Sequence, residues 1–221
     1  MKKIVIIHTS PVSLNDLKNL VKEYMPDVEM VNIIDDSLLE EVKKNGCITP
    51  GIISRMSAYI RIAETLHPDL IFNQCSSVGE AFDIAKKGTS VATLKIDEAM
   101  AEKAVLTGRT IGVIATVAST VQPSCNLIQE KAKKIHKEVR IIPYLVEGAL
   151  DILMKEGNVP KHNQLVLNEI QKACEVCDVV VLAQGSMITL LPYLKNVTKP
   201  VLTSPKLAIQ RAKDMLYSIS K

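Results

Sequence analysis

The sequence predicts an α/β protein built from two similar halves, each with a parallel sheet flanked by helices. Short apolar strands alternate with helical segments along the 221 residues, a pattern typical of parallel sheets with right-handed crossovers. In addition, residues 69–78, DLIFNQCSSV, can be laid over residues 178–187, DVVVLAQGSM. Each copy starts with an Asp, continues as an apolar strand and ends in a turn that contains Ser. These two observations indicate an internal repeat.

The first half is predicted to contain four strands separated by helices. Apolar, largely β-branched runs predict the strands, and capping residues and prolines mark the helix starts. Ser13 is expected to cap the first helix, Ser76 and Ser77 the fourth, and Pro50 suits the first turn of the third. The expected strands are 3–8, 28–33, 69–75 and 90–94, and the expected helices are 13–24, 36–44, 49–66 and 76–87.

The second half repeats this plan. A further helix, opened by Pro205, ends the chain. The expected strands are 110–115, 139–144, 178–184 and 200–202, and the expected helices are 97–106, 121–137, 147–155 and 160–174. Ligands of such sheets bind beyond the carboxyl ends of the strands. The strand exits at His8, Cys75, Thr116 and Gln184 therefore form the candidate site.

Composition excludes several classes of function. A net charge of +3 with interspersed Lys and Glu gives no basic stripe, so no nucleic-acid partner is expected. No run of 18 apolar residues and no signal peptide are present, so we expect no membrane partner and a cytoplasmic protein. The CxxC pair, Cys174 and Cys177, ends a helical run instead of starting one. This favours a structural role over redox or metal chemistry, and no metal site is expected.

Three segments carry a resemblance to a known family. NQCSSVGEA, IGVIATVASTVQPS and VVVLAQGSM resemble segments of the aspartate/glutamate/hydantoin racemase superfamily, and the resemblance covers essentially the whole chain. It implies two pseudo-symmetric, flavodoxin-like domains, residues 1–96 with 205–221 and residues 97–204, with the active site in the cleft between them. It also implies chemistry without a cofactor, at the carbon next to a carboxylate of a small substrate. A homo-oligomer stays open.

The chain departs from the family pattern at the second catalytic position. Racemases of this family place one cysteine on each face of the substrate. Cys75 matches the first, whereas Gln184 stands where the second is expected; aligning Gly185 there instead also leaves no thiol. A neutral amide cannot act as a general acid or base. Two-thiol racemisation is therefore not expected, and isomerase or lyase chemistry with one thiol remains, similar in thiol count to the arylmalonate decarboxylases.

Cys75 is the predicted reactive group for a physical reason. It precedes a helix whose first amides are unpaired, and that positive end should stabilise a thiolate. The same amides, with the Ser76 and Ser77 hydroxyls, could bind a carboxylate or an enolate oxygen. The alternative is a buried cysteine that only packs.

The other candidates are polar residues at the remaining strand exits. His8 could relay a proton beside Thr9 and Ser10, or it could be a histidine satisfied by a neighbouring backbone group. Thr116, Ser119 and Thr120 resemble the family's carboxylate-binding turn, although they could also cap a helix. The predicted substrate-binding residues are Thr9, Ser10, Asn73, Ser76, Ser77, Thr116, Ser119, Thr120, Gly185 and Ser186.

Two alternatives to a one-thiol enzyme remain. The first is a non-catalytic protein that binds small carboxylates, having kept the fold and lost one thiol. The second is a racemase in which His8 replaces the missing base, which requires His8 to face the substrate opposite Cys75. The sequence leaves the substrate undetermined.

Overall fold

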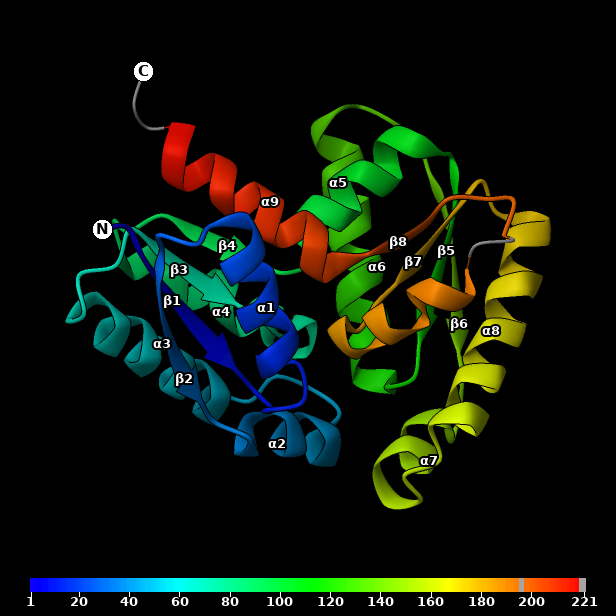
Figure 1. Cartoon of the computed structure of the whole chain (residues 1–221), viewed down its shortest axis with the longest axis horizontal. Coiled ribbons are helices and arrows are strands. Elements are labelled where there is room, and N and C mark those ends of the chain that lie inside the picture. The colour runs from blue at the N-terminus through cyan, green and yellow to red at the C-terminus, as the bar shows by residue number, and fades with distance from the viewer. Residues whose placement is uncertain (195–196, 219–221) are drawn as a thin grey trace. The chain divides into compact units, whose positions relative to one another are not determined.

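The computed structural model, which describes residues 1–194 and 197–218 apart from the Ser186 side chain, confirms the predicted fold class. The chain forms two compact units, one made of Met1–Ile96 with Pro205–Lys221 and the other of Asp97–Ser204. Each unit contains a four-stranded parallel sheet with helices on its faces (Figure 1). The strand orders are β2-β1-β3-β4 and β6-β5-β7-β8, so the second sheet repeats the topology of the first.

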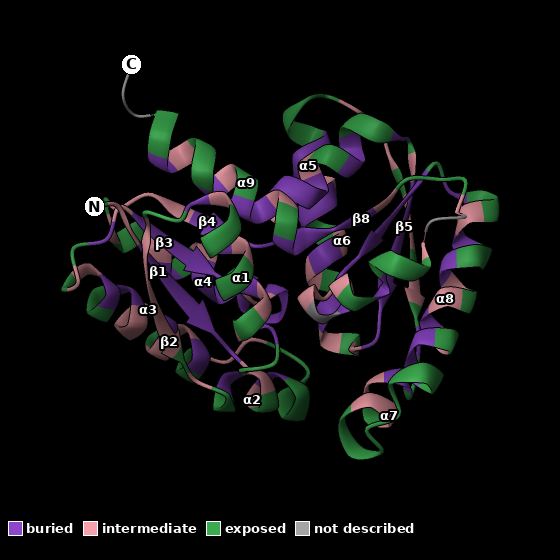
Figure 2. Ribbon diagram, in the orientation of Figure 1, coloured by how far each residue is buried: buried purple, intermediate pink, exposed green. Residues whose placement is uncertain are grey.

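In the first unit, helices cover both faces of the sheet. The strands are β1 (Lys3–His8), β2 (Glu29–Ile34), β3 (Leu70–Asn73) and β4 (Thr93–Lys95), and the α-helices are α1 (Leu14–Tyr24), α2 (Ser37–Asn45), α3 (Pro50–Glu64), α4 (Gly79–Ala85) and α9 (Ser204–Tyr217). Because side chains of a strand alternate between faces, Ile4 and Ile6 pack with α1 and α9, whereas Val5 and Ile7 pack with α2, α3 and α4. Figure 2 shows the resulting burial of β1 and β3.

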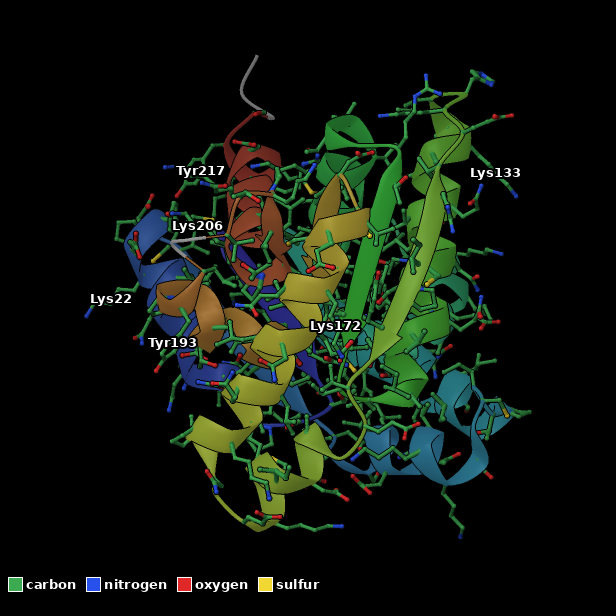
Figure 3. The ribbon with its side chains drawn as sticks, turned by 90° about the vertical axis from the view of Figure 1, so that its right-hand side faces the viewer. Lys22, Lys133, Lys172, Tyr193, Lys206 and Tyr217 are labelled. Atoms are coloured by element: carbon green, nitrogen blue, oxygen red, sulfur yellow. The ribbon has the colours of Figure 1, made fainter. Side chains whose placement is uncertain are left out.

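Helix α9 belongs to the core of the first unit, although it ends the chain. Four of its residues, Ala208, Ile209, Ala212 and Leu216, are buried against β1 and β3. Two contacts of its outer surface join it to the neighbouring α1 region: Lys206 lies over the Tyr24 ring, and the Tyr217 hydroxyl donates to Asp27 at 2.8 Å. Figure 3 labels Lys206 and Tyr217 along this helix. The first unit is thus completed by the last helix.

The second unit has the same layered construction. Its strands are β5 (Thr110–Ala115), β6 (Arg140–Leu145), β7 (Val179–Leu182) and β8 (Val201–Thr203), and its α-helices are α5 (Glu98–Thr107), α6 (Ala118–Lys134), α7 (Ala149–Lys155) and α8 (Val159–Val176). One core joins Ile114, Val180 and Leu182 to α7 and α8. Helices α5 and α6 contact β5, β6 and β7. No helix within the described ranges is long and apolar enough to cross a membrane.

Several expected boundaries are wrong at the carboxyl ends of the strands. Strands β3 and β7 end at Asn73 and Leu182, two residues before Cys75 and Gln184, because the chain turns there into 3-10 helices. One of these, η1 (Ser76–Val78), contains Ser76 and Ser77, which form the turn and do not cap α4. The other, η3 (Gly185–Tyr193), was not predicted and is held by burial of Met187 and Leu190.

Candidate functional site

The first unit brings the exits of β1 and β3 together. The two strands are parallel neighbours with Ile7 opposite Asn73, and the Gln74 N–H donates to the Ile7 carbonyl at 3.0 Å. Beyond this pair, Ile7 is followed by His8 and Thr9, and Asn73 is followed by Gln74 and Cys75. This register is what places the Thr9 hydroxyl in hydrogen-bonding contact with the Cys75 sulfur.

Three residues besides Thr9 hold Cys75 in place. Its sulfur also accepts hydrogen bonds from the backbone amides of Ser77 and Val78 and from the Ser77 hydroxyl. The side chain of Asn73 fixes the backbone of Cys75, since its Nδ2 donates to the Cys75 carbonyl at 2.9 Å and its Oδ1 accepts from the Cys75 N–H at 3.4 Å. The sulfur thus lies in a cradle of donors, while part of the residue remains exposed.

The protonation of Cys75 is set by a competition between burial and hydrogen bonding. Burial raises the pKa of the thiol, because a thiolate loses hydration there, and the bonds from Thr9, Ser77 and Val78 lower it by less. The net pKa lies above the ordinary value. The predicted donors at the helix start are present and favour the thiolate, but burial outweighs them, so the resting thiol is protonated at neutral pH.

His8 is buried at the end of β1 and bonded to another strand. Its Nε2 lies 2.9 Å from the Asn32 Oδ1 on β2, whereas its Nδ1 is buried with no hydrogen-bond partner among the residues the structure describes. Burial lowers the pKa of His8 and the nearby Lys18 charge lowers it further, outweighing the hydrogen bond to Asn32, which raises it. His8 is therefore a neutral imidazole at pH 7.

The remaining predicted residues of the first unit serve local structure as well. The Ser10 Oγ accepts from the Val12 N–H at 3.2 Å. Ser13 stands at the start of α1 without a side-chain capping bond, and instead accepts from the Gln74 amide. Ser76 and Ser77 are both buried in η1. Substrate contacts by these residues stay predictions.

In the second unit, the exits of β5 and β7 place Thr116 beside Gln184. The Thr116 N–H donates to the Gln184 Oε1 at 3.0 Å, and the Thr116 hydroxyl lies 3.4 Å from the same oxygen. The Gln184 Nε2 is buried and has no hydrogen-bond partner in the described part of the chain. Thr116 is buried, and Gln184 is partly exposed.

Cys75 and Gln184 occupy equivalent positions in the two units. Both immediately precede a 3-10 helix, with φ and ψ of −125° and 120° at Cys75 and −121° and 139° at Gln184. The residue before each donates its N–H to the neighbouring central strand, Gln74 to Ile7 at 3.0 Å and Ala183 to Ile114 at 2.9 Å. The geometry therefore pairs Cys75 with Gln184, and not with Gly185.

Thr9 and Thr116 are equivalent in the same way. Each follows a residue whose carbonyl accepts an N–H from the neighbouring edge segment, His8 from Asp35 at 3.0 Å and Ala115 from Val146 at 2.8 Å. Each threonine then bonds to the strand-end residue beside it, Thr9 to Cys75 and Thr116 to Gln184. The two units thus carry the same pair of positions, with a thiol in one and an amide in the other.

The other predicted residues of the second unit lie at the starts of α6 and η3. Thr120 is buried and Ser119 partly buried in the first turn of α6, whose N-terminal cap is Val117 without a side-chain capping bond. Helix α6 begins three residues before its expected start. Gly185 begins η3, and the Ser186 side chain lies outside what the structure describes.

Asn32 is a candidate that the sequence argument missed. It is a polar residue within the strand EMVNII, and this interruption of an apolar run was the available signal. Gln74 was missed because its partner, Ser13, lies 61 positions away. A hollow of about 520 Å³ in the second unit is lined by residues of the β6 exit and α8, including Glu147, Glu169 and Lys172, and by none of the predicted site residues. The described residues contain no group of three or more metal-binding side chains.

Known structures share this fold. A putative Asp/Glu racemase of Yersinia pestis superposes with a TM-score of 0.76 at 14% identity, covering 97% of this chain and 98% of that one. An aspartate racemase homologue of Pyrococcus horikoshii has a TM-score of 0.71 and 18% identity, with 100% of both chains covered. A glutamate racemase of Francisella tularensis, solved with D-glutamate, has a TM-score of 0.69 and 12% identity, covering 99% of this chain and 81% of that one.

Sequence comparison gives the family. No curated protein matches the chain. The Asp/Glu/Hydantoin racemase family, however, matches residues 14–212, which include Cys75, Thr116 and Gln184 but not Thr9. With a match over most of its length and a shared fold, the chain belongs to the Asp/Glu/hydantoin racemase family.

Proposed function

We propose that this protein is an enzyme that acts without a cofactor at the carbon next to a carboxylate of a small substrate, with Cys75 transferring the proton. The observation that carries the proposal is the cradle around the Cys75 sulfur, formed by the Thr9 hydroxyl and the Ser77 and Val78 amides. These donors can stabilise the thiolate that remains after a proton leaves. Membership of a racemase family supports the class of reaction.

The second thiol of the family is replaced by Gln184 in this proposal. The equivalence of Cys75 and Gln184 in the two units supports the replacement. An amide neither gives nor takes a proton at neutral pH, so racemisation by two thiols is not the reaction we propose. His8 is the candidate for a second base, because its Nδ1 is without a partner among the described residues and its ring is neutral at pH 7.

A protonated Cys75 suits a reaction that begins with a proton donor. Its raised pKa makes the resting group an acid. In a decarboxylation, the bond to the departing carboxylate breaks, carbon dioxide leaves, and the electron pair stays on the α-carbon. The Cys75 S–H then gives its proton to that carbon, and water reprotonates the thiolate. A lyase of this type therefore fits the resting site better than a racemase, which must first remove a proton.

The same raised pKa also favours a second candidate function. A protein that only binds small carboxylates needs no thiolate, and the Cys75 and Gln184 environments both supply hydrogen-bond donors. Turnover by the purified protein distinguishes this alternative from an enzyme.

Replacement of Cys75 is the direct test. The parent protein, Cys75→Ala and Cys75→Ser would be incubated in deuterium oxide with aspartate, glutamate and 2-substituted malonates, and products followed by NMR. We expect both variants to lose about 10²–10⁴-fold or more in rate, the usual contribution of acid–base catalysis. Circular dichroism should show an unchanged fold. Cys47→Ala is the matched control, because Cys47 is exposed and outside the site. Full activity of Cys75→Ala would disprove the proposal.

A further inference from the structure

The Gln184 side chain is held in one orientation by its oxygen. A backbone N–H can only donate a hydrogen bond, so the amide atom 3.0 Å from the Thr116 nitrogen must be the oxygen. The Thr116 hydroxyl, 3.4 Å from the same atom, is directed to it as well. The usual ambiguity between the two ends of an amide is thereby resolved by the partner. The other end of the side chain is the NH₂ group.

This NH₂ group is buried with its donors unused. The Nε2 atom has no hydrogen-bond partner among the described residues, although it is shielded from solvent. A buried donor without an acceptor is unfavourable, and native proteins retain few of them. The other such side-chain atoms in the described chain include the His8 Nδ1, which also belongs to a strand exit. Unsatisfied groups of this kind are expected where a ligand supplies the missing partner.

Comparison of the two units shows why the Gln184 side chain offers a ligand only hydrogen-bond donors. At Cys75 the sulfur receives the hydrogen bond from Thr9. At Gln184 the amide oxygen receives the bond from Thr116, and the NH₂ group extends one bond beyond the carbonyl carbon. The acceptor of the amide is thus occupied, so a ligand at this position meets only N–H groups.

We propose that the Gln184 NH₂ group binds a carboxylate oxygen of the substrate, as a fixed and uncharged hydrogen-bond donor. The substrate class rests on the proposed function above. A carboxylate offers the acceptors that the NH₂ group lacks, whereas an ammonium group offers none. Gln184 therefore contributes to binding and orientation of the substrate, while acid–base chemistry is left to other groups.

The test measures binding separately from turnover. Malonate, succinate, aspartate and glutamate would be titrated calorimetrically into the full chain carrying Cys75→Ala, which removes the proposed acid. In that background, Gln184→Glu replaces the NH₂ group by oxygen and adds a negative charge, and Gln184→Met removes the donors at similar length. We expect Gln184→Glu to weaken binding of the tightest probe by at least about 10-fold, and Gln184→Met to weaken it by less, since it adds no repulsion.

The matched control is Gln164→Glu, which makes the same chemical change on the exposed surface of α8. In the Cys75→Ala background, this control should bind the probe as tightly as Cys75→Ala alone. Circular dichroism and thermal unfolding would show that each variant is folded, and a misfolded Gln184→Glu leaves Gln184→Met as the deciding variant. Unchanged affinity in both Gln184 variants, or no binding of any probe to the Cys75→Ala protein, overturns the inference.

The outcome separates this inference from the proposed function. If Cys75→Ala abolishes turnover but a Gln184→Glu single variant keeps the parent's kcat/KM, the enzyme proposal stands and the role of Gln184 is refuted. If Cys75→Ala keeps full turnover while Gln184→Glu loses carboxylate binding, the role of Gln184 stands and the role of Cys75 is refuted.

Discussion

At Cys75, burial and hydrogen bonding act on the thiol in opposite directions. The local sequence, a cysteine before a helix start, predicts a stabilised thiolate, and the predicted amide donors of Ser77 and Val78 are present. What the sequence could not give is the amount of hydration the sulfur loses, because that depends on packing around it from distant segments. Burial is the larger effect, so the pKa is raised. The position of Cys75 between a strand and a helical turn was predictable here, but its protonation was not.

The reactivity of the five cysteines tests this balance. Alkylation requires the thiolate, and each unit by which the pKa is raised lowers the thiolate fraction at neutral pH about tenfold. We expect iodoacetamide to modify Cys75 of the native protein more slowly than the exposed Cys47 at pH 7.5. The Cys75 rate should continue to rise with pH beyond 9. Peptide mass spectrometry at several pH values measures both rates in one sample. Faster modification of Cys75 than of Cys47 at pH 7.5 would show that the donors outweigh burial.

At the scale of elements, the Asp that begins each of the two repeated sequence segments has the same structural role. Asp69, before β3, accepts from the Lys3 N–H at 2.8 Å, and Asp178, before β7, accepts from the Arg109 and Thr110 N–H groups, each at 2.8 Å. Each Asp thus fixes the start of the neighbouring central strand. Helix η3 was not predictable in this way, since Gly185 and Pro192 disfavour a helix and tertiary burial of its apolar residues holds it.

An ion-pair cluster fastens β2 to α2 and α3 near the exit of β2. Arg55 on α3 donates to Asp35 at 3.0 Å and also pairs with Glu41 on α2. The Tyr59 hydroxyl donates to the same Asp35 carboxylate at 2.6 Å. Burial raises the pKa of Asp35, but the bonds from Ser37 and Tyr59 and the charge of Arg55 outweigh it and hold the pKa below its usual range. Burial, and then the hydrogen bond to Asp35, raise the pKa of Tyr59 to about 12.

Removing Arg55 should therefore destabilise the protein in a pH-dependent way. A lowered carboxyl pKa gives stability that is present above the unfolded-state pKa and is lost as the pH falls through the folded-state pKa. We expect Arg55→Leu to lower the free energy of unfolding by about 1.5–3 kcal/mol at pH 7, the range for hydrogen bonds to charged groups. The difference from the parent should shrink below about pH 4, near the ordinary carboxyl pKa.

Urea unfolding followed by circular dichroism at pH 7 and pH 3.5 measures this difference. Lys155→Met is the control, because it removes an ion pair whose partners, Lys155 and Asp151, are 74% and 66% exposed. Pairs of that kind contribute at most about 1 kcal/mol. A loss in Arg55→Leu no larger than in Lys155→Met would mean that the cluster adds no stability.

At the scale of the whole molecule, the chain uses one topology twice and gives each copy a different strand-end group. Alternating strands and helices were sufficient to predict both sheets, because the pattern is local and strong. The side-chain partners of the site, such as Asn32 for His8, were not, because they join strands that are apart in sequence. The functional consequence lies in the asymmetry between a thiol at Cys75 and an amide at Gln184.

This asymmetry predicts the stereochemistry of the reaction. If Cys75 alone delivers the proton, the substrate carbanion is protonated on one face, so a chiral product forms as a single enantiomer. A carbanion made by removing an α-hydrogen should likewise take up deuterium with retention of configuration. Each enantiomer of aspartate and glutamate, and a prochiral 2-substituted malonate, would be incubated in deuterium oxide, with label followed by NMR and configuration by chiral chromatography.

Interconversion of enantiomers at the rate of deuterium uptake would contradict the one-thiol mechanism, because it requires a proton donor on the opposite face. Gln184 cannot supply that proton at neutral pH. The neutral imidazole of His8 could take the α-proton from one enantiomer and return a proton as the imidazolium so formed, so the same experiment on His8→Asn would then decide whether His8 is the second base. If that variant kept deuterium uptake but stopped interconversion, the protein would be a racemase with one thiol and one imidazole. If interconversion persisted, the second base would lie elsewhere.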